Sequence, residues 1–118
     1  MSQAPSEIRY DRASRLLRVT FADSVLSLPA EYLRVESPSA EVQGHGPGQK
    51  KLVVGRRYVG IIGIEPVGHY AVRLLFDDLH DSGIYAWDYL RELAREHDMR
   101  WQGYLSDLAD KGLSRDPA

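Results

Sequence analysis

The chain has 118 residues, a length that suits one domain with one hydrophobic core. Lysine and arginine number 15 against 17 aspartates and glutamates, so the formal net charge is -2 and no basic field attracts a nucleic-acid backbone. Cysteine is absent, which excludes disulfides, thiol nucleophiles and cysteine-based zinc or iron–sulfur sites. Neither a signal peptide nor a membrane-spanning apolar run is found. We therefore expect a cytoplasmic protein that binds neither nucleic acid nor membrane.

Alternating apolar and polar side chains predict three antiparallel strands in the first part of the chain. They cover residues 7–11, 17–21 and 25–28, and Pro29 ends the third because it has no N–H for a ladder bond. Residues 30–35 are long enough for a short helix. Glu31 and Arg34 are expected to stay in solvent on this helix.

The middle of the chain predicts a helix start, a loop and further strands. Ser37 followed by Pro38 is typical of a helix N-terminus. Residues 44–49 hold three glycines and a proline, which predicts a loop. Strands are expected over 52–54, 58–64 and 70–76, with a turn at 65–68. Apolar residues on both faces of 58–64, Ile62 among them, indicate a central strand.

Beyond residue 77 the apolar period changes from two to about 3.6, which predicts helices that begin near Ile84 and Met99. Gly112 is a natural end of the second helix. The whole chain, 1–118, is thus expected to be one α+β domain with a small, mainly antiparallel sheet and two C-terminal helices, and 114–118 to be a flexible tail. The expected core comprises Val19, Phe21, Ile62, Val72, Leu74, Leu90 and Leu93.

Residue types alone identify no activity. The glycine-rich loop is not a phosphate-binding P-loop, because a strand is expected after Lys50 and Lys51 where that motif has a helix. Ser37, Ser39 and His45 lie near one another in the sequence, but no nucleophile-elbow motif accompanies them.

The four histidines show no spacing typical of metal ligands. His80 lies among Asp77, Asp78 and Asp81, which fits either a carboxylate-rich metal pocket or a solvated turn, and the turn is favoured because charged loop clusters are usually solvated.

Four motifs in order carry a family resemblance: LPAEYLR at 28–34, SPSAEVQGHG at 37–46, IEPVG at 64–68 and FDDLHDSGIY at 76–85. Over residues 6–95 the chain resembles the N-terminal domain of gamma-butyrobetaine hydroxylases, and most closely the stand-alone bacterial members of unknown function. The resemblance implies that 98–113 is an added C-terminal helix. Two positions depart from the family pattern, because Ser24 and Leu79 stand where glycine is expected in Asp-Gly turns.

In those hydroxylases the Fe(II) and 2-oxoglutarate chemistry belongs to a following domain, so the resemblance implies no catalytic residue and no cofactor here. The family's N-terminal domain often binds a structural zinc through C-P-C-x-x-C and a downstream histidine. The matching positions in this chain are Ser37, Ser39, Val42 and His80. Three of the four ligands are therefore missing, and no metal is expected.

The leading hypothesis is a non-catalytic binding or adaptor domain that docks a protein partner or a small anionic ligand. One alternative is an accessory subunit that acts in trans with a 2-oxoglutarate-dependent oxygenase. Another is an accessory factor in iron–sulfur protein maturation, because similar domains are appended to scaffold proteins of cluster assembly. On its own the chain is not expected to be an enzyme. The candidate binding surface comprises Arg34, Ser37, Ser39, Glu41, His45, Glu65, His69 and His80.

Overall fold

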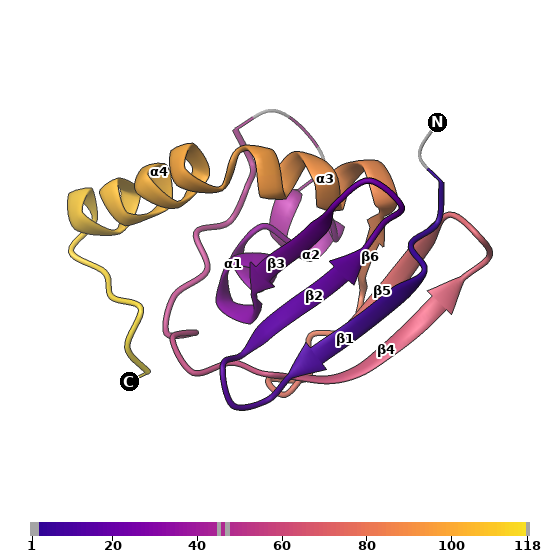
Figure 1. The fold of residues 1–118 in the computed structure, drawn as a ribbon. Helices are drawn as coiled ribbons and strands as arrows, with labels where there is room; N and C mark the ends of the chain where they lie inside the picture. Colours follow the sequence, from indigo (N-terminus) through magenta and orange to yellow (C-terminus); the bar gives the residue numbers. More distant parts are fainter. Residues whose placement is uncertain (1–2, 45, 47, 118) are drawn as a thin grey trace.

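Two separate three-stranded antiparallel sheets form the β part of the computed structural model, which describes residues 3–44, 46 and 48–117 (Figure 1). Their strand orders are β1-β2-β3 and β4-β5-β6. Helices α1 and α2 follow the first sheet, and α3 and α4 follow the second. The predicted α+β class with two C-terminal helices is confirmed. The described strands, however, form two sheets where one small sheet was expected.

The first sheet matches the strands expected from the alternating pattern. It consists of β1 (Glu7–Asp11), β2 (Leu16–Thr20) and β3 (Val25–Pro29). Leu17 of β2 lies opposite Leu28 of β3, and both side chains are buried. The alternation places these residues and Val19 on the face that packs into the core, as period-2 patterning requires.

The second sheet corrects several expectations. It consists of β4 (Ile61–Val67), β5 (Ala71–Phe76) and β6 (Gly83–Ala86). Residues 52–54 form no strand, and the expected turn at 65–68 begins only after Val67. Strand β4 pairs with β5 alone among the described strands, so it is an edge strand rather than a central one. The pairing register of β4 with β5 shifts between Ile61 and Gly63. Ile62, which lies at this shift, is 68% exposed rather than buried as expected.

The helices are α1 (Ala30–Val35), α2 (Ala40–Gln43), α3 (Trp87–Arg95) and α4 (His97–Asp110). Helix α1 has the expected bounds. Ser39, and not Ser37, is the N-cap of α2, because its side chain accepts the N–H of Glu41. Helix α3 begins at Trp87 because the preceding residues pair with β5 as β6.

One core joins both sheets and α3. The expected core residues other than Ile62 are buried, and they belong to one cluster with Tyr32 and Tyr85. The hydroxyl of Tyr32 donates to the carbonyl of Leu93, and that of Tyr85 donates to the carbonyl of Leu33. These bonds satisfy two phenolic groups that burial would otherwise penalise. Helix α1 is thereby fixed between α3 and the second sheet.

Helix α1 is buried on all sides, which corrects the expectation that Glu31 and Arg34 stay in solvent. Arg115 donates from Nη2 and Nε to the two carboxylate oxygens of Glu31, at 2.6 and 2.8 Å.

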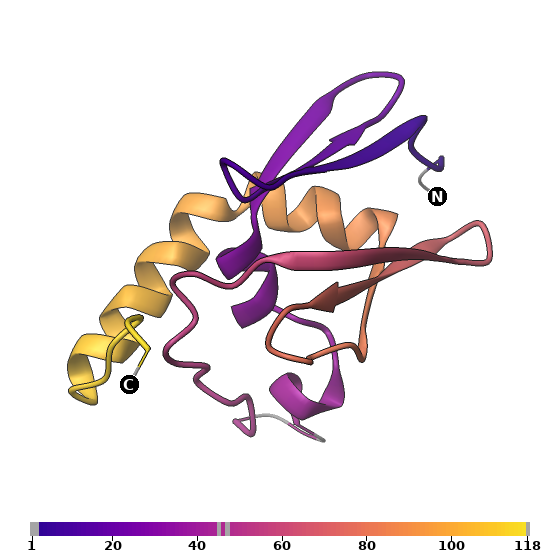
Figure 2. The same cartoon turned by 90° about the horizontal axis from the view of Figure 1, so that it is seen from below.

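The C-terminal segment is also held by backbone hydrogen bonds. The N–H of Gly55 donates to the carbonyl of Ser114, and the N–H of Arg57 donates to the carbonyl of Arg115. Residues 114–117 thus lie against the link between α2 and β4, where a loose tail was expected (Figure 2).

No helix in the described ranges combines the length and the apolar character that crossing a bilayer requires.

The central packing predicts a large cost for Leu74→Ala. Leu74 is completely buried in β5, so the variant should lose about 2–5 kcal/mol of unfolding free energy. The exposed Ile62 of β4 is the matched control, and Ile62→Ala should change stability by about 0.5 kcal/mol or less. Urea unfolding of both variants checks this. A loss below about 1 kcal/mol for Leu74→Ala would mean that Leu74 is not a core residue.

Candidate functional site

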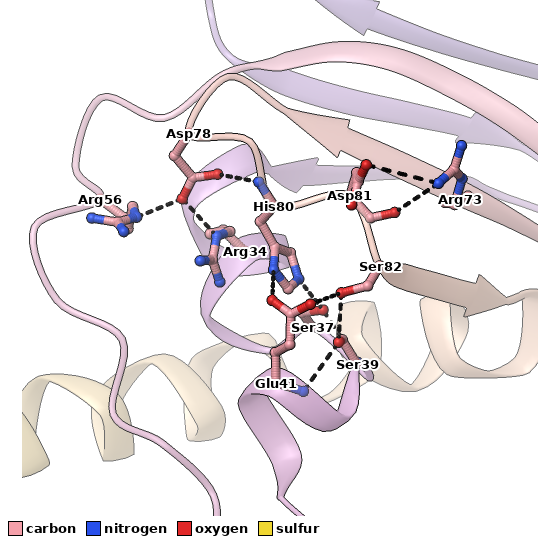
Figure 3. A network of polar contacts seen from close by, with 10 residues as sticks. All are labelled: Arg34, Ser37, Ser39, Glu41, Arg56, Arg73, Asp78, His80, Asp81 and Ser82. Atoms are coloured by element: carbon pink, nitrogen blue, oxygen red, sulfur yellow. Dashed lines mark hydrogen bonds and ion pairs between the residues drawn. The ribbon is translucent and has the colours of Figure 1, made fainter.

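The end of α1, the start of α2 and the turn that follows β5 meet at one corner of the molecule (Figure 3). The turn spans residues 77–80, and it is closed by a hydrogen bond from the N–H of Phe76 to the carbonyl of His80. Leu79 within it has φ +72°, a left-handed conformation that a bulky residue rarely adopts. This geometry turns the side chain of His80 back toward α1 and α2.

Five side chains at this corner form a hydrogen-bonded group, here named the serine–histidine cluster: Ser37, Ser39, Glu41, His80 and Ser82. His80 Nε2 lies 2.8 Å from Ser37 Oγ, and His80 Nδ1 lies 3.4 Å from Glu41 Oε2. The Ser82 hydroxyl donates to Glu41 at 2.9 Å and lies 2.7 Å from the hydroxyl of Ser39. The cluster therefore ties the turn after β5 to both ends of the α1–α2 link.

A second group beside the cluster is built on Asp78. Its Oδ2 accepts from Arg34 Nε at 2.8 Å and from Arg56 Nε at 2.6 Å, and its Oδ1 accepts from the N–H of His80 at 3.1 Å. Burial alone would raise the pKa of Asp78. The hydrogen bonds from Arg34, His80 and Arg56 and the charge of Arg34 outweigh burial and lower that pKa below its ordinary value. Asp78 is thus held as a carboxylate between two guanidinium groups.

His80 is held in its neutral form. Burial is the main cause that lowers the pKa of His80, and the charge of Arg34 adds to it. The carboxylates of Glu41 and Asp78 oppose this shift without cancelling it. With its proton on Nδ1 facing Glu41, the neutral ring accepts at Nε2 from the hydroxyl of Ser37.

This order of groups, hydroxyl to imidazole to carboxylate, is also the order in a serine nucleophile with its base. Ser37, however, is 0% exposed. A Cβ placed on Gly83 would lie only 2.7 Å from Ser37 Oγ, so the backbone of β6 covers the hydroxyl directly. No acyl group has room to reach Ser37, and the arrangement acts as a structural link.

The structure brings five of the proposed site residues together, connects Glu65 to the same corner through Arg73 and Asp81, and separates His69 from it. Arg34 and the proposed members of the serine–histidine cluster share this corner. Glu65 lies on β4 and pairs with Arg73, which also contacts Asp81. His69 precedes β5 while His80 follows it, so β5 separates them by about 20 Å of extended chain. The remaining proposed residue, His45, lies outside the described residues.

Sequence reasoning missed Arg56 and Ser82 as members of this corner. Arg56 follows a segment that was expected to be a strand, and no motif marks it. Ser82 lies in the motif at 76–85 but was not among the candidate site residues. The acidic neighbours of His80 were the available signal for Asp78, and its two arginine partners come from distant parts of the chain.

The donor set at the family's zinc positions does not fit zinc. Two hydroxyls, from Ser37 and Ser39, and the isopropyl group of Val42 stand where thiolates are needed, and His80 is the one imidazole. Among the described residues no group of three or more histidine, cysteine, aspartate or glutamate side chains is placed to hold a metal ion. Hydrogen bonds of the serine–histidine cluster occupy this corner instead.

A pocket of about 360 Å³ opens beside the cluster, between α1, residues 51–56 and the 77–80 turn. Arg34, Lys51, Arg56 and His80 line it together with apolar residues. The Nη1 atom of Arg34 is buried and has no hydrogen-bond partner within the described ranges. A buried donor left in this state costs about 1–3 kcal/mol. Arg34 therefore contributes to the pocket lining a guanidinium group that has one unsatisfied donor.

The buried, neutral His80 predicts a loss of stability in acid. Its pKa is lower in the folded chain than in the unfolded chain, where it is about 6.5. As the pH falls below that value the unfolded state binds a proton first, so unfolding free energy should decrease from about pH 7 to about pH 5. Urea unfolding across this range should show a weaker pH dependence for His80→Gln than for the parent chain.

The matched control for the acid effect is His97→Gln, at the more exposed first residue of α4. This variant should keep the pH dependence of the parent chain. Equal pH dependence in the parent and in His80→Gln would contradict the assignment.

The donor set also predicts that the purified chain holds no stoichiometric zinc and that chelators leave its melting temperature unchanged. The triple change Ser37→Cys, Ser39→Cys and Val42→Cys should create three thiolates around His80 and bind one zinc. The same triple variant with His80→Gln should bind zinc more weakly. Elemental analysis is the measurement. About one zinc per unmodified chain, or a triple variant without metal, would refute this account.

Comparison with known proteins connects this geometry to a family. The family described as "Gamma-butyrobetaine hydroxylase-like, N-terminal" matches residues 8–91. Among curated proteins there is no significant match.

Solved structures give close matches. Two proteins with NMR solution structures are 50% and 42% identical to this chain, with TM-scores of 0.86 and 0.85. The alignments cover 100% and 98% of this chain, and 94% and 87% of those proteins. A crystal structure from Acidithiobacillus ferrooxidans, of a protein with unknown function in the DUF971 family, is 42% identical with a TM-score of 0.65. That alignment covers 76% of this chain and 91% of the other. The chain belongs to the gamma-butyrobetaine hydroxylase-like N-terminal domain family.

Proposed function

We propose that the chain is a cytoplasmic, non-catalytic binding domain that docks a protein partner at the corner just described. The docking face consists of Glu41, Lys51, Arg56 and Leu79. Its side chains come from α2, from the link to β4 and from the turn after β5. Glu41, Lys51 and Arg56 line the pocket, and the exposed Leu79 lies in the turn between Asp78 and the pocket-lining His80.

The observation that carries this proposal is the state of Leu79. Its side chain is 84% exposed, and its backbone is left-handed. That conformation costs about 1–2 kcal/mol for an L-residue, and an exposed side chain offsets little of this by packing within the chain. Single exposed leucines are ordinary on protein surfaces, but one held at a strained position in a tight turn is not. A partner that covers Leu79 supplies the missing burial.

The polar groups nearby support binding rather than catalysis. Ser37 is sealed under Gly83, and the pKa of His80 is lowered by burial. The two ring nitrogens of His80 are directed at Ser37 and at Glu41. Groups fixed in this way hold a surface in shape, which is what a docking domain requires.

Site-specific photo-crosslinking tests the proposal. Leu79→p-benzoylphenylalanine places a photoreactive ring at the exposed position of the docking face. Val25→p-benzoylphenylalanine is the matched control, because Val25 is a 62% exposed apolar residue on β3 of the other sheet. After irradiation in lysate of the native host, a discrete adduct is expected from position 79 and not from position 25. Equal adducts at both positions, or no adduct from position 79, would overturn the proposal.

The identity of the adduct separates the roles. An oxygenase would make the domain an accessory subunit in trans, and a cluster-assembly protein would make it a factor in iron–sulfur protein maturation. Any other protein would make it an adaptor for a different process.

A further inference from the structure

We propose that the pocket at the docking face binds one carboxylate group carried on a short aliphatic chain. This inference rests on the docking face being a binding surface. Its starting point is Arg34, which is only 9% exposed and has Nη1 unpartnered within the described ranges. Figure 3 shows the guanidinium of Arg34 with Nε toward Asp78 and its terminal nitrogens turned away from that carboxylate. A planar guanidinium presents donors whose geometry matches a carboxylate.

The charged side chains at the pocket carry one net positive charge. Arg34, Arg56 and Lys51 contribute three positive charges, and Asp78 and Glu41 contribute two negative charges. Lys51 forms no ion pair with any described residue, and its side chain is exposed at the pocket. One positive charge is therefore in excess, and a single carboxylate balances it.

The remaining walls select against a purely inorganic anion. Val42, Leu52, Val53 and Val54 form the apolar part of the pocket lining. The volume of about 360 Å³ lies in the range of small-ligand sites. An aliphatic chain of a few carbons would contact these side chains while its carboxylate faces Arg34. Phosphate would leave the apolar wall uncovered.

Among the described residues, the two other places with a cationic pocket or an unpartnered guanidinium nitrogen already have counter-groups. In the neighbouring pocket between α4 and residues 50–53, Lys50 and Arg100 both pair with the buried Glu36. Arg91 also has an unpartnered Nε, but its guanidinium carbon lies 3.9 Å from the ring centre of Phe21. Arg91 also forms an ion pair with Asp23, so a carboxylate and an aromatic ring both contact its guanidinium.

Titration of the isotope-labelled full chain by two-dimensional NMR tests the inference, with sodium butyrate as the probe at constant ionic strength and neutral pH. Saturable shifts are expected at the amides of residues 34, 51–56 and 78–80. Sodium phosphate and n-butylammonium chloride are the controls for the carboxylate and for the aliphatic chain. Equal shifts with either control, or no saturable shift with butyrate, would overturn the inference.

Two variants locate the site. Arg34→Lys removes the terminal guanidinium nitrogens and should abolish butyrate binding. Because this side chain is buried, its variant requires an unchanged overall spectrum as proof of folding. Lys51→Gln changes an exposed residue and should weaken binding about two- to fivefold. Arg18→Gln on β2 removes the same charge in the other sheet and should leave binding unchanged. Equal weakening by Lys51→Gln and Arg18→Gln would mean a general charge effect and would reject the site.

A blocked tripeptide, acetyl-Val-Glu-Val-amide, distinguishes the two sources of the carboxylate. Tighter binding of butyrate indicates a free acid as the occupant, and tighter binding of the tripeptide indicates an acidic side chain of the partner. The two experiments distinguish a failure of the carboxylate site from a failure of the proposed protein docking. Adducts from position 79 without butyrate binding reject only the carboxylate site, and butyrate binding without adducts rejects only the protein docking.

Discussion

The shared carboxylate of Asp78 is the interaction on which this corner depends. It receives two guanidinium groups and one backbone N–H from three separate parts of the chain: α1, the link after α2 and its own turn. Because these groups are largely buried, removing one partner leaves a charge uncompensated, whereas an exposed ion pair is dispensable. The left-handed turn at Leu79 and the direction of His80 both follow from where Asp78 is anchored.

The alternation of apolar and polar residues and the position of proline predicted the elements that depend only on neighbouring residues. The first three strands and α1 follow from alternation and from Pro29, and they lie where expected. Strand β6 was missed because its four residues run directly into α3 with no turn between them. Ile62 was misplaced because a register shift interrupts β4, and alternation alone does not reveal such a shift.

The sequence predicted part of the candidate site. Ser37 and His80 are 43 positions apart, and a family motif, not periodicity, connected them. The burial of Glu31 and Arg34 was not foreseeable, since a helix pattern shows which side chains are polar but not that distant partners cover them. Their partners are 84 and 44 positions away. Glu65 and His69 were grouped with this corner by sequence motif, and the length of β5 separates His69 from it.

The contacts of residues 114–116 have a consequence for the order in which the molecule assembles during synthesis. Glu31 of α1 is synthesised early and is buried in the folded chain, yet its arginine partner is synthesised 84 residues later. The N–H groups at positions 55 and 57 likewise wait for the carbonyls of Ser114 and Arg115. Glu31, in the first turn of α1, therefore lacks its arginine partner until residue 115 has been synthesised. The burial of α1 with its charge paired is therefore a late step of folding, however early the strands of the first sheet form.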